Sequence, residues 1–190
     1  MSAFVRSASD TLETEDAVQG DEQIREALER NVKAVSLRAG LGKGTATTTA
    51  VLRPGLDCTV TEGPFELKVG MSTKSGGRGD APNPGILGRG ALASCLAICY
   101  GMWAARLGVP CDAIEVEVQA DYDSRGELGV ADDVRPGYSE IRYVVTVVSA
   151  SPEQDVLRVL DTADRYSAYR DVFANDVPLR REVRITAGTV

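Results

Sequence analysis

The sequence predicts an α+β domain built on an antiparallel sheet. Segments with strand-like patterns come in groups, rather than alternating one by one with helices. Between two of these groups lies a long apolar segment, Ile86 to Leu107, which follows Pro84 and ends at Gly108, as helices do. With 190 residues, 43% of them apolar, the chain is long enough for one domain with a core.

The N-terminal residues predict a tail followed by a helix. Residues 1–19 show no periodicity, so we expect a loose tail there. Residues 21–34 predict an amphipathic helix, because apolar side chains recur every four positions. These side chains are Ile24, Leu28 and Val32. We therefore divide the chain into a tail and helix, residues 1–35, and a single α+β domain, residues 36–190.

Six segments predict strands, from β-branched residues or from alternation of apolar and polar side chains. They are residues 45–52, 56–61, 65–71, 114–122, 138–150 and 177–186. A helix is predicted from Pro152 to about Tyr166, with Ser151 as its N-cap, because apolar residues again follow a helical period. Residues 171–175 predict a short helix or turn.

The segment Ile86 to Leu107 is apolar nearly all round, so as a helix it must be buried on most sides. Its uncharged stretch, between Arg89 and Arg106, is shorter than the roughly 20 residues that a bilayer span needs. We expect a core helix and no membrane insertion. One sheet of this size cannot cover such a helix, which favours a second subunit as the missing cover.

Composition excludes several classes of function. The formal net charge of −7 and the pI near 4.7 argue against binding to nucleic acid or to an anionic membrane. The sequence contains no histidine, which removes histidine-dependent triads, imidazole bases and the commonest metal ligand. We expect no metal and no cofactor. The polar, acidic N-terminus does not resemble a secretory signal, so we expect a cytoplasmic protein.

The four cysteines are expected to be free thiols in a reducing cytosol. Cys95 and Cys99 lie one turn apart on one face of the apolar helix, where the parallel Cβ directions disfavour a disulfide between them. A free cysteine on an apolar helix is often simply part of the core. Cys58 and Cys111 have the pattern of structural residues.

The run from Asn83 to Cys95, NPGILGRGALASC, resembles the central-helix signature of the OsmC/Ohr family of osmotically inducible and organic-hydroperoxide-resistance proteins. The turn at Pro136 to Tyr138 and the segment Asp164 to Ser167 also fit that family, and the resemblance spans about residues 45–186. It implies antiparallel sheets wrapped around buried central helices in an intertwined homodimer, with active sites at the subunit interface.

The resemblance implies that Cys95 is the peroxidatic thiol, which would attack a hydroperoxide, become a sulfenic acid and be captured by a second cysteine. The sequence departs from the family at two positions. Ser167 stands at the place of the second cysteine, and Gly85 stands at the place of a frequent glutamate. Cys111 is an alternative capturing thiol.

A buried thiol is mostly protonated at neutral pH unless a cation lies nearby, because an unassisted thiol has a pKa of about 8.5 and burial raises it. The candidates for a cation beside Cys95 are Arg53, Arg38 and Arg89. Arg53 and Arg38 belong to the N-terminal region that supplies an arginine in the family. The sequence does not choose among the three, and we take Arg53 as the first candidate.

Three functions remain open at this point. One is a thiol redox protein that reduces organic hydroperoxides through Cys95, with an external thiol as reductant. The second is a non-catalytic dimer that binds a small apolar ligand or senses redox state. The third is a structural dimer with neither role. The retained Cys95 favours the first, and the departures at Gly85 and Ser167 favour the second.

Overall fold

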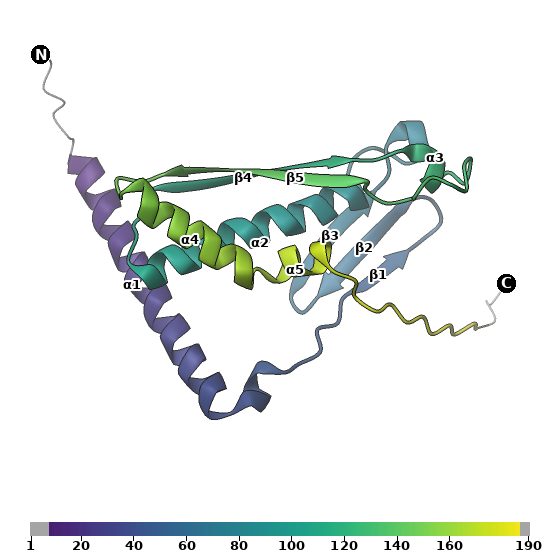
Figure 1. Cartoon of the computed structure of the whole chain (residues 1–190). Helices are drawn as coiled ribbons and strands as arrows, with labels where there is room; N and C mark the ends of the chain where they lie inside the picture. Colours follow the sequence, from purple (N-terminus) through teal and green to yellow (C-terminus); the bar gives the residue numbers. More distant parts are fainter. Residues whose placement is uncertain (1–7, 187–190) are drawn as a thin grey trace, which may run out of the picture.

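The computed structural model describes residues 8–186, with side chains in the first helix described from Asp21 onward. Five α-helices, five strands and two short 3-10 helices follow one another in these residues (Figure 1). In chain order they are α1 (Ala8–Leu37), η1 (Ala39–Gly42), β1 (Thr49–Leu52), β2 (Asp57–Glu62), β3 (Phe65–Gly70), η2 (Thr73–Ser75), α2 (Pro84–Leu107), β4 (Ala113–Asp121), α3 (Ser124–Glu127), β5 (Glu140–Val148), α4 (Glu153–Tyr166) and α5 (Ala168–Ala174).

The predicted apolar helix is α2, and its two ends have the expected residues. Pro84 is in its first turn, and the side chain of Asn83 caps the helix by accepting a hydrogen bond from the Ile86 backbone N–H at 2.9 Å. Gly108 ends the helix with φ of 67°, a left-handed conformation that glycine adopts at low cost. The prediction is confirmed, with a start two residues earlier than expected.

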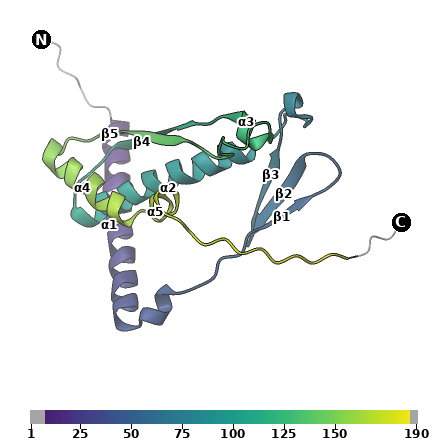
Figure 2. The ribbon, with the colours of Figure 1, turned by 45° about the vertical axis from the view of Figure 1, so that its right-hand side comes forward.

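The strands form two antiparallel sheets, as predicted. β1, β2 and β3 make a meander, and β4 pairs with β5 along all nine residues of each strand. The long β4–β5 hairpin lies along α2, whereas the meander stands apart from it (Figures 1 and 2). Because side chains alternate along a strand, one face of the hairpin packs on α2. That face carries Ile114, Val116, Val118, Ile141, Tyr143 and Val145.

The core lies between α2, the β4–β5 hairpin and α4. Leu92, Leu96 and Tyr100 of α2 are buried together with Ala163 of α4. Against this cluster, Trp103 of α2 stacks on Tyr166 of α4 with ring centroids 5.2 Å apart. The helix predicted from Pro152 therefore packs by its apolar face, as its period indicated.

The opposite face of α2 is open in the single chain, so the predicted burial on most sides is wrong for one chain alone. Ile98 is 63% exposed and Met102 is 37% exposed. Among the described residues, α2 is the one helix long and apolar enough to cross a membrane, a property that core helices share. Its packing against the hairpin and α4 is that of a core helix that a single chain covers on one side.

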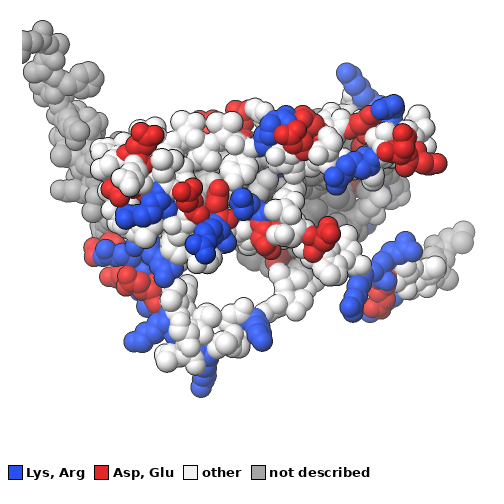
Figure 3. Space-filling view, viewed as in Figure 1, with Lys and Arg blue, Asp and Glu red and all other residues white. Residues whose placement is uncertain are grey.

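The N-terminal helix crosses the C-terminal end of α2 and then leaves the body of the molecule (Figure 2). The expectation of a loose tail at residues 1–19 is wrong for residues 8–19, which are helical. Residues 1–7 lie outside the described residues. Beyond α2, the helix continues to Leu37 and a linker returns to β1. An open gap separates this linker from the body in the space-filling view (Figure 3).

Three further expectations need correction. Residues 45–48 lie outside β1, where the predicted strand began. The N-cap position of α4 is held by Pro152, and Ser151 makes no cap hydrogen bond there. Residues 177–186 do not form a strand, because no neighbouring strand of the same chain pairs with them within the described residues. In this last segment Leu179 is 96% exposed and Ile185 is 91% exposed.

Candidate functional site

Cys95 and Ser167 are 72 positions apart in the sequence and meet in the fold. The Cys95 Sγ atom lies 3.7 Å from the Ser167 Oγ atom. Cys95 is carried by α2, while Ser167 joins α4 to α5 and is only 3% exposed. The Ser167 hydroxyl also caps α5 by accepting a hydrogen bond from the Arg170 backbone N–H at 3.4 Å. The residue at the place of the family's second cysteine is thus in contact with the candidate nucleophile.

None of the three candidate arginines contacts Cys95 within the described chain. Arg89 donates to the Tyr138 hydroxyl at 2.8 Å. It also lies six residues before Cys95 on α2, which places it about 120° away around the helix axis. Arg53 lies in the exposed segment between β1 and β2, and Arg38 is exposed between α1 and η1. The role of Arg53 as thiolate partner stays a prediction.

Gly85 lies beside Arg89 and Tyr138, at the start of α2. A Cβ atom added at Gly85 would lie 3.3 Å from the Arg89 Nη1 atom and 3.4 Å from the Tyr138 hydroxyl. The Tyr138 hydroxyl also donates to the Gly85 carbonyl oxygen at 3.4 Å. A carboxylate at position 85 would therefore reach the Arg89 guanidinium, and the glycine leaves that cation without it.

A polar network that was not predicted from the sequence connects Tyr100 of α2 with Tyr143, Asp164 and Arg170. The Tyr100 and Tyr143 hydroxyls donate to the two carboxylate oxygens of Asp164, at 2.7 and 2.9 Å. Arg170 donates from Nε to the Tyr143 hydroxyl at 3.1 Å and lies 3.9 Å from Asp164. Burial raises the pKa of Tyr100 far above its ordinary value, and the Asp164 carboxylate adds to the rise. The network joins α2, β5, α4 and α5 around the site.

The other two cysteines near α2 are poor candidates for chemistry. The Cys99 thiol donates to the Ala163 carbonyl oxygen at 3.5 Å, and burial raises its pKa, with Cys95 and Asp164 adding to the effect. Burial also raises the pKa of Cys111. Cys111 follows the far end of α2, and the helix from Cys95 to Leu107 alone spans about 18 Å, so Cys111 cannot capture Cys95 within one chain.

The raised pKa of Cys99 predicts slow alkylation at neutral pH. In a variant that keeps Cys99 and replaces the other three cysteines with serine, we expect the rate of iodoacetamide labelling to rise only well above the pH at which free cysteine reacts, because the thiolate is the reacting form. Labelling in urea provides the unfolded control. A labelling profile in the folded variant equal to that of free cysteine would contradict the structural role.

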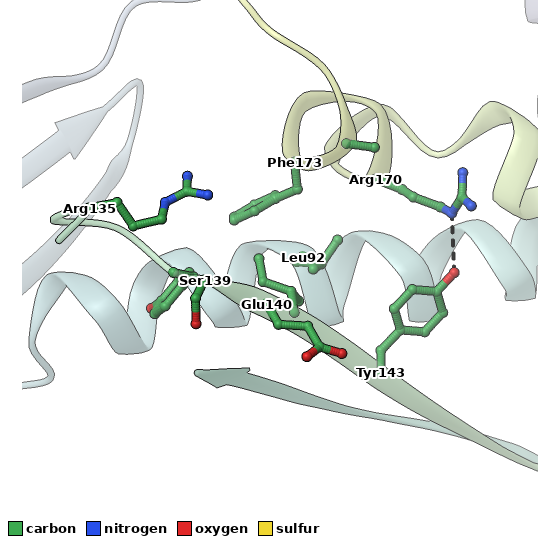
Figure 4. A pocket seen from close by; sticks show the side chains of 10 residues that line it. Leu92, Arg135, Ser139, Glu140, Tyr143, Arg170 and Phe173 are labelled. Atoms are coloured by element: carbon green, nitrogen blue, oxygen red, sulfur yellow. Dashed lines mark hydrogen bonds between the residues drawn. The ribbon is translucent and has the colours of Figure 1, made fainter. Parts of the chain in front are cut away.

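A pocket of about 410 Å³ opens between β5, α5 and α2, one helical turn from the Cys95–Ser167 pair. Leu92 precedes Cys95 by three residues on α2, and Arg170 follows Ser167 by three residues. Figure 4 shows Arg135 at one end, Arg170 with Tyr143 at the other, and Leu92 and Phe173 between them. Its volume is within the range of small-molecule sites.

Among the described residues, the side chains around Cys95 and the pocket do not form a set of ligands typical of a metal centre. Within the part of the chain that the structure describes, no group of three or more cysteine, aspartate or glutamate side chains is arranged to hold a metal ion. On the face shown in Figure 3, acidic and basic side chains are interspersed. The arrangement offers a thiol, a neighbouring hydroxyl and a pocket, which are the parts of a thiol-based site rather than of a metal site.

Comparison with known proteins is consistent with this architecture. The fold is similar to an OsmC-like protein from Mycoplasma pneumoniae, with a TM-score of 0.60, 14% identity, and coverage of 70% of this chain and 89% of that chain. It is also similar to an organic hydroperoxide resistance protein OsmC from Legionella pneumophila, with a TM-score of 0.50, 16% identity, and coverage of 69% of this chain and 91% of that chain. None of the curated proteins compared with the chain matches it.

Sequence identities of 14% and 16% show a common fold but not a common activity. The sequence itself provides the stronger link, since the family model described as OsmC-like protein matches residues 77–182, more than half of the chain. That range includes α2, Cys95 and the segment that carries Ser167. The chain therefore belongs to the OsmC-like protein family.

Proposed function

We propose that the protein is a thiol peroxidase that reduces organic hydroperoxides through Cys95. The observation that carries the proposal is the position of Cys95 on α2, with its Sγ atom against the buried Ser167 hydroxyl and one helical turn from a pocket. The Cys95 thiolate attacks the terminal oxygen of ROOH, the O–O bond breaks, and ROH leaves once it has taken up a proton. The thiolate is thereby oxidised to a sulfenic acid.

The second half of the cycle requires a reductant from outside the chain. The Ser167 hydroxyl cannot form a disulfide, and Cys99 lies one turn away on the same helix, where disulfide geometry is unfavourable. An external thiol attacks the sulfenic sulfur and releases water, and a second thiol releases Cys95 and forms the external disulfide. Such a cycle needs a reducing compartment, so the proposal includes a cytoplasmic location.

The working form in this proposal is an intertwined homodimer. Support comes from the open face of α2 with Ile98 and Met102, from the gap beside the linker to β1, and from the unpaired segment 177–186. A second copy would cover the open face of α2 and would pair with residues 177–186. It would also allow the meander that carries Arg53 to approach the Cys95 of its partner, which one chain alone does not do.

The dimer predicts a specific effect of a charge on the open face of α2. Ile98→Asp is expected to convert the dimer into monomers, because it would bury an unpaired carboxylate between the two central helices. Analytical ultracentrifugation measures the change, and Leu157→Asp, on the exposed face of α4, serves as a control that leaves assembly intact. A dimeric Ile98→Asp protein would contradict this interface.

The peroxidase proposal is tested by peroxide consumption. Purified protein is expected to consume cumene hydroperoxide in the presence of dithiothreitol, and Cys95→Ser is expected to abolish this activity. Cys111→Ser, beyond the C-terminal end of α2, is the matched control that changes one thiol and keeps the rate. A wild-type protein without turnover, or a rate unchanged in Cys95→Ser, would rule the proposal out.

The second candidate is a non-catalytic dimer that binds a small apolar ligand or senses redox state. It is favoured by one observation, that no cationic side chain contacts Cys95 among the described residues of the chain. Native mass spectrometry separates the two proposals. A co-purified small molecule in an inactive protein supports the second, and an empty dimer with rapid turnover supports the first.

A further inference from the structure

The Ser167 hydroxyl is a buried polar group with two hydrogen-bond neighbours among the described residues. A hydroxyl has one proton to donate and two lone pairs that accept. One lone pair accepts from the Arg170 backbone N–H at 3.4 Å. The other neighbour is the Cys95 Sγ atom, at 3.7 Å. Because buried donors are rarely left without an acceptor, the Ser167 proton is directed at the Cys95 sulfur.

The strength of this hydrogen bond depends on whether the sulfur carries a proton. A neutral thiol is both a weak donor and a weak acceptor. A thiolate has no proton, so the Ser167 hydroxyl can only donate to it, and a hydrogen bond to an ionised partner is about twice as strong as one between neutral groups. A donor that binds the charged form more strongly favours that form. Ser167 therefore favours the thiolate of Cys95.

Contacts on both sides fix the position of Ser167. Asp164 lies three residues before it, and Arg170 lies three residues after it. Asp164 is tied to α2 and to β5 by the hydroxyls of Tyr100 and Tyr143. Arg170 donates to the Tyr143 hydroxyl (Figure 4), and its Nη1 atom donates to the Asp164 carbonyl oxygen at 3.5 Å. The junction between α4 and α5 that carries Ser167 is thereby held against α2.

The charged and titratable groups near the pair come from four elements. They are Cys99 and Tyr100 on α2, Asp164 on α4, Tyr143 on β5 and Arg170 on α5. Burial raises the pKa of Cys99 and Asp164 adds to the rise, so this carboxylate disfavours a thiolate close to it. Arg170, the cation of the set, donates to Tyr143 and lies 3.9 Å from Asp164. In the described part of the chain, the Ser167 hydroxyl is thus the donor that contacts the Cys95 sulfur.

We propose that Ser167 is the hydrogen-bond donor that holds Cys95 as a thiolate. The proposal rests on the proposed function and adds the group that prepares the nucleophile. The thiol proton passes to solvent before the attack, whereas the Ser167 proton stays on its oxygen while the thiolate attacks the hydroperoxide. Asp164, Tyr143 and Arg170 are positioning residues, because they fix Ser167 and act on the sulfur through it.

The test measures the thiolate and requires no turnover. In a variant that keeps Cys95 and replaces the other three cysteines with serine, the rate of iodoacetamide alkylation is recorded against pH, since the thiolate is the reacting form. Ser167→Ala is expected to move the midpoint of this profile upward by about one pH unit, because a hydrogen bond to a charged group is lost. Alkylation then becomes about tenfold slower at pH values below the midpoint. An unchanged midpoint would overturn the proposal.

Two further variants at position 167 separate the hydrogen bond to Cys95 from the cap of α5. Ser167→Thr keeps the hydroxyl and is expected to keep the wild-type profile. Alanine is a poor N-cap, whereas glycine at this position costs a helix little. Both lack the hydroxyl, so Ser167→Gly is expected to give the same upward shift as Ser167→Ala. A wild-type profile in Ser167→Gly would show that the cap matters and not the donor, which would overturn the proposal.

Tyr143→Phe tests the positioning role. It removes the hydroxyl that joins Asp164 to Arg170, and it is expected to raise the midpoint by less than Ser167→Ala does. In the Ser167→Ala background the same change should add nothing, because no hydroxyl remains to be positioned. A shift of equal size in both backgrounds would show that the network acts on Cys95 without Ser167, and would overturn this role.

Turnover provides a second readout. For cumene hydroperoxide, kcat/KM of Ser167→Ala is expected to fall about tenfold at pH values below the midpoint and to approach the wild-type value at high pH, where the thiolate forms without help. A wild-type protein without turnover would reject the proposed function, while the alkylation profiles would still decide whether Ser167 donates to Cys95. Turnover with the same pH profile in wild type and Ser167→Ala would reject only the present inference.

Discussion

Ser167→Cys is expected to turn the site into one that forms an intramolecular disulfide with Cys95 in each turnover. The two side-chain atoms are already 3.7 Å apart, and a disulfide requires a separation of about 2 Å, which a small rotation of both side chains provides. After one equivalent of cumene hydroperoxide, both thiols should become resistant to alkylation until a dithiol is added. Captured in this way, the sulfenic acid no longer waits for an external thiol.

A cysteine elsewhere is the control for this result. Ser124→Cys adds an exposed thiol in α3, an element outside the contact between Cys95 and Ser167, and its reaction with peroxide is expected to leave Cys95 unpaired. Peptide mapping of the oxidised proteins identifies the bonded residues. If Ser167→Cys retains two free thiols after peroxide treatment, then residue 167 is not placed to capture Cys95 in solution.

Leu96→Ala is expected to destabilise the protein by about 2–5 kcal/mol. Leu96 is fully buried at 0% exposure, and it packs with Leu92, Tyr100 and Ala163 at the centre of the core. The smaller side chain leaves a cavity that the rigid packing of α2 against the β4–β5 hairpin cannot fill. Urea unfolding monitored by circular dichroism measures the loss of stability.

The matched variant on the other face of α2 is Ile98→Ala. Its expected loss of stability depends on protein concentration, because in our proposal Ile98 is covered only by the second copy. Leu96→Ala is expected to destabilise the packing within each chain as well, so part of its loss of stability is independent of protein concentration. Equal and concentration-independent losses in the two variants would indicate that the open face of α2 is not an interface.

Much of the fold could be predicted from the sequence because its elements are marked by local chemistry. The prolines and glycines around α2, the alternation in β4 and β5, and the helical period of α4 each point to one structure. The sequence predicts a strand at residues 177–186, and this prediction is wrong for the single chain because a strand also needs a neighbour. Local pattern does not say where that neighbour is.

The candidate site was predictable only in part. Cys95 and Ser167 were identified from the resemblance to a family, and the fold places their side chains in contact. The network around Asp164 was missed, since a tyrosine on a buried helix and an aspartate in a polar stretch carry no signal that they will meet. The cation that would activate Cys95 is not identified in a single chain, because none of the candidate arginines contacts Cys95 there.

The half-covered central helix has a consequence for how the protein reaches its working state. The hairpin and α4 can assemble around one side of α2 within a single chain, whereas in the dimer that we propose the side that carries Ile98 is covered only when two chains meet. Refolding should then show a slow phase that accelerates as protein is added. Until that encounter, each newly made chain presents an apolar helix face and an unpaired apolar segment, the kind of surface that chaperones bind.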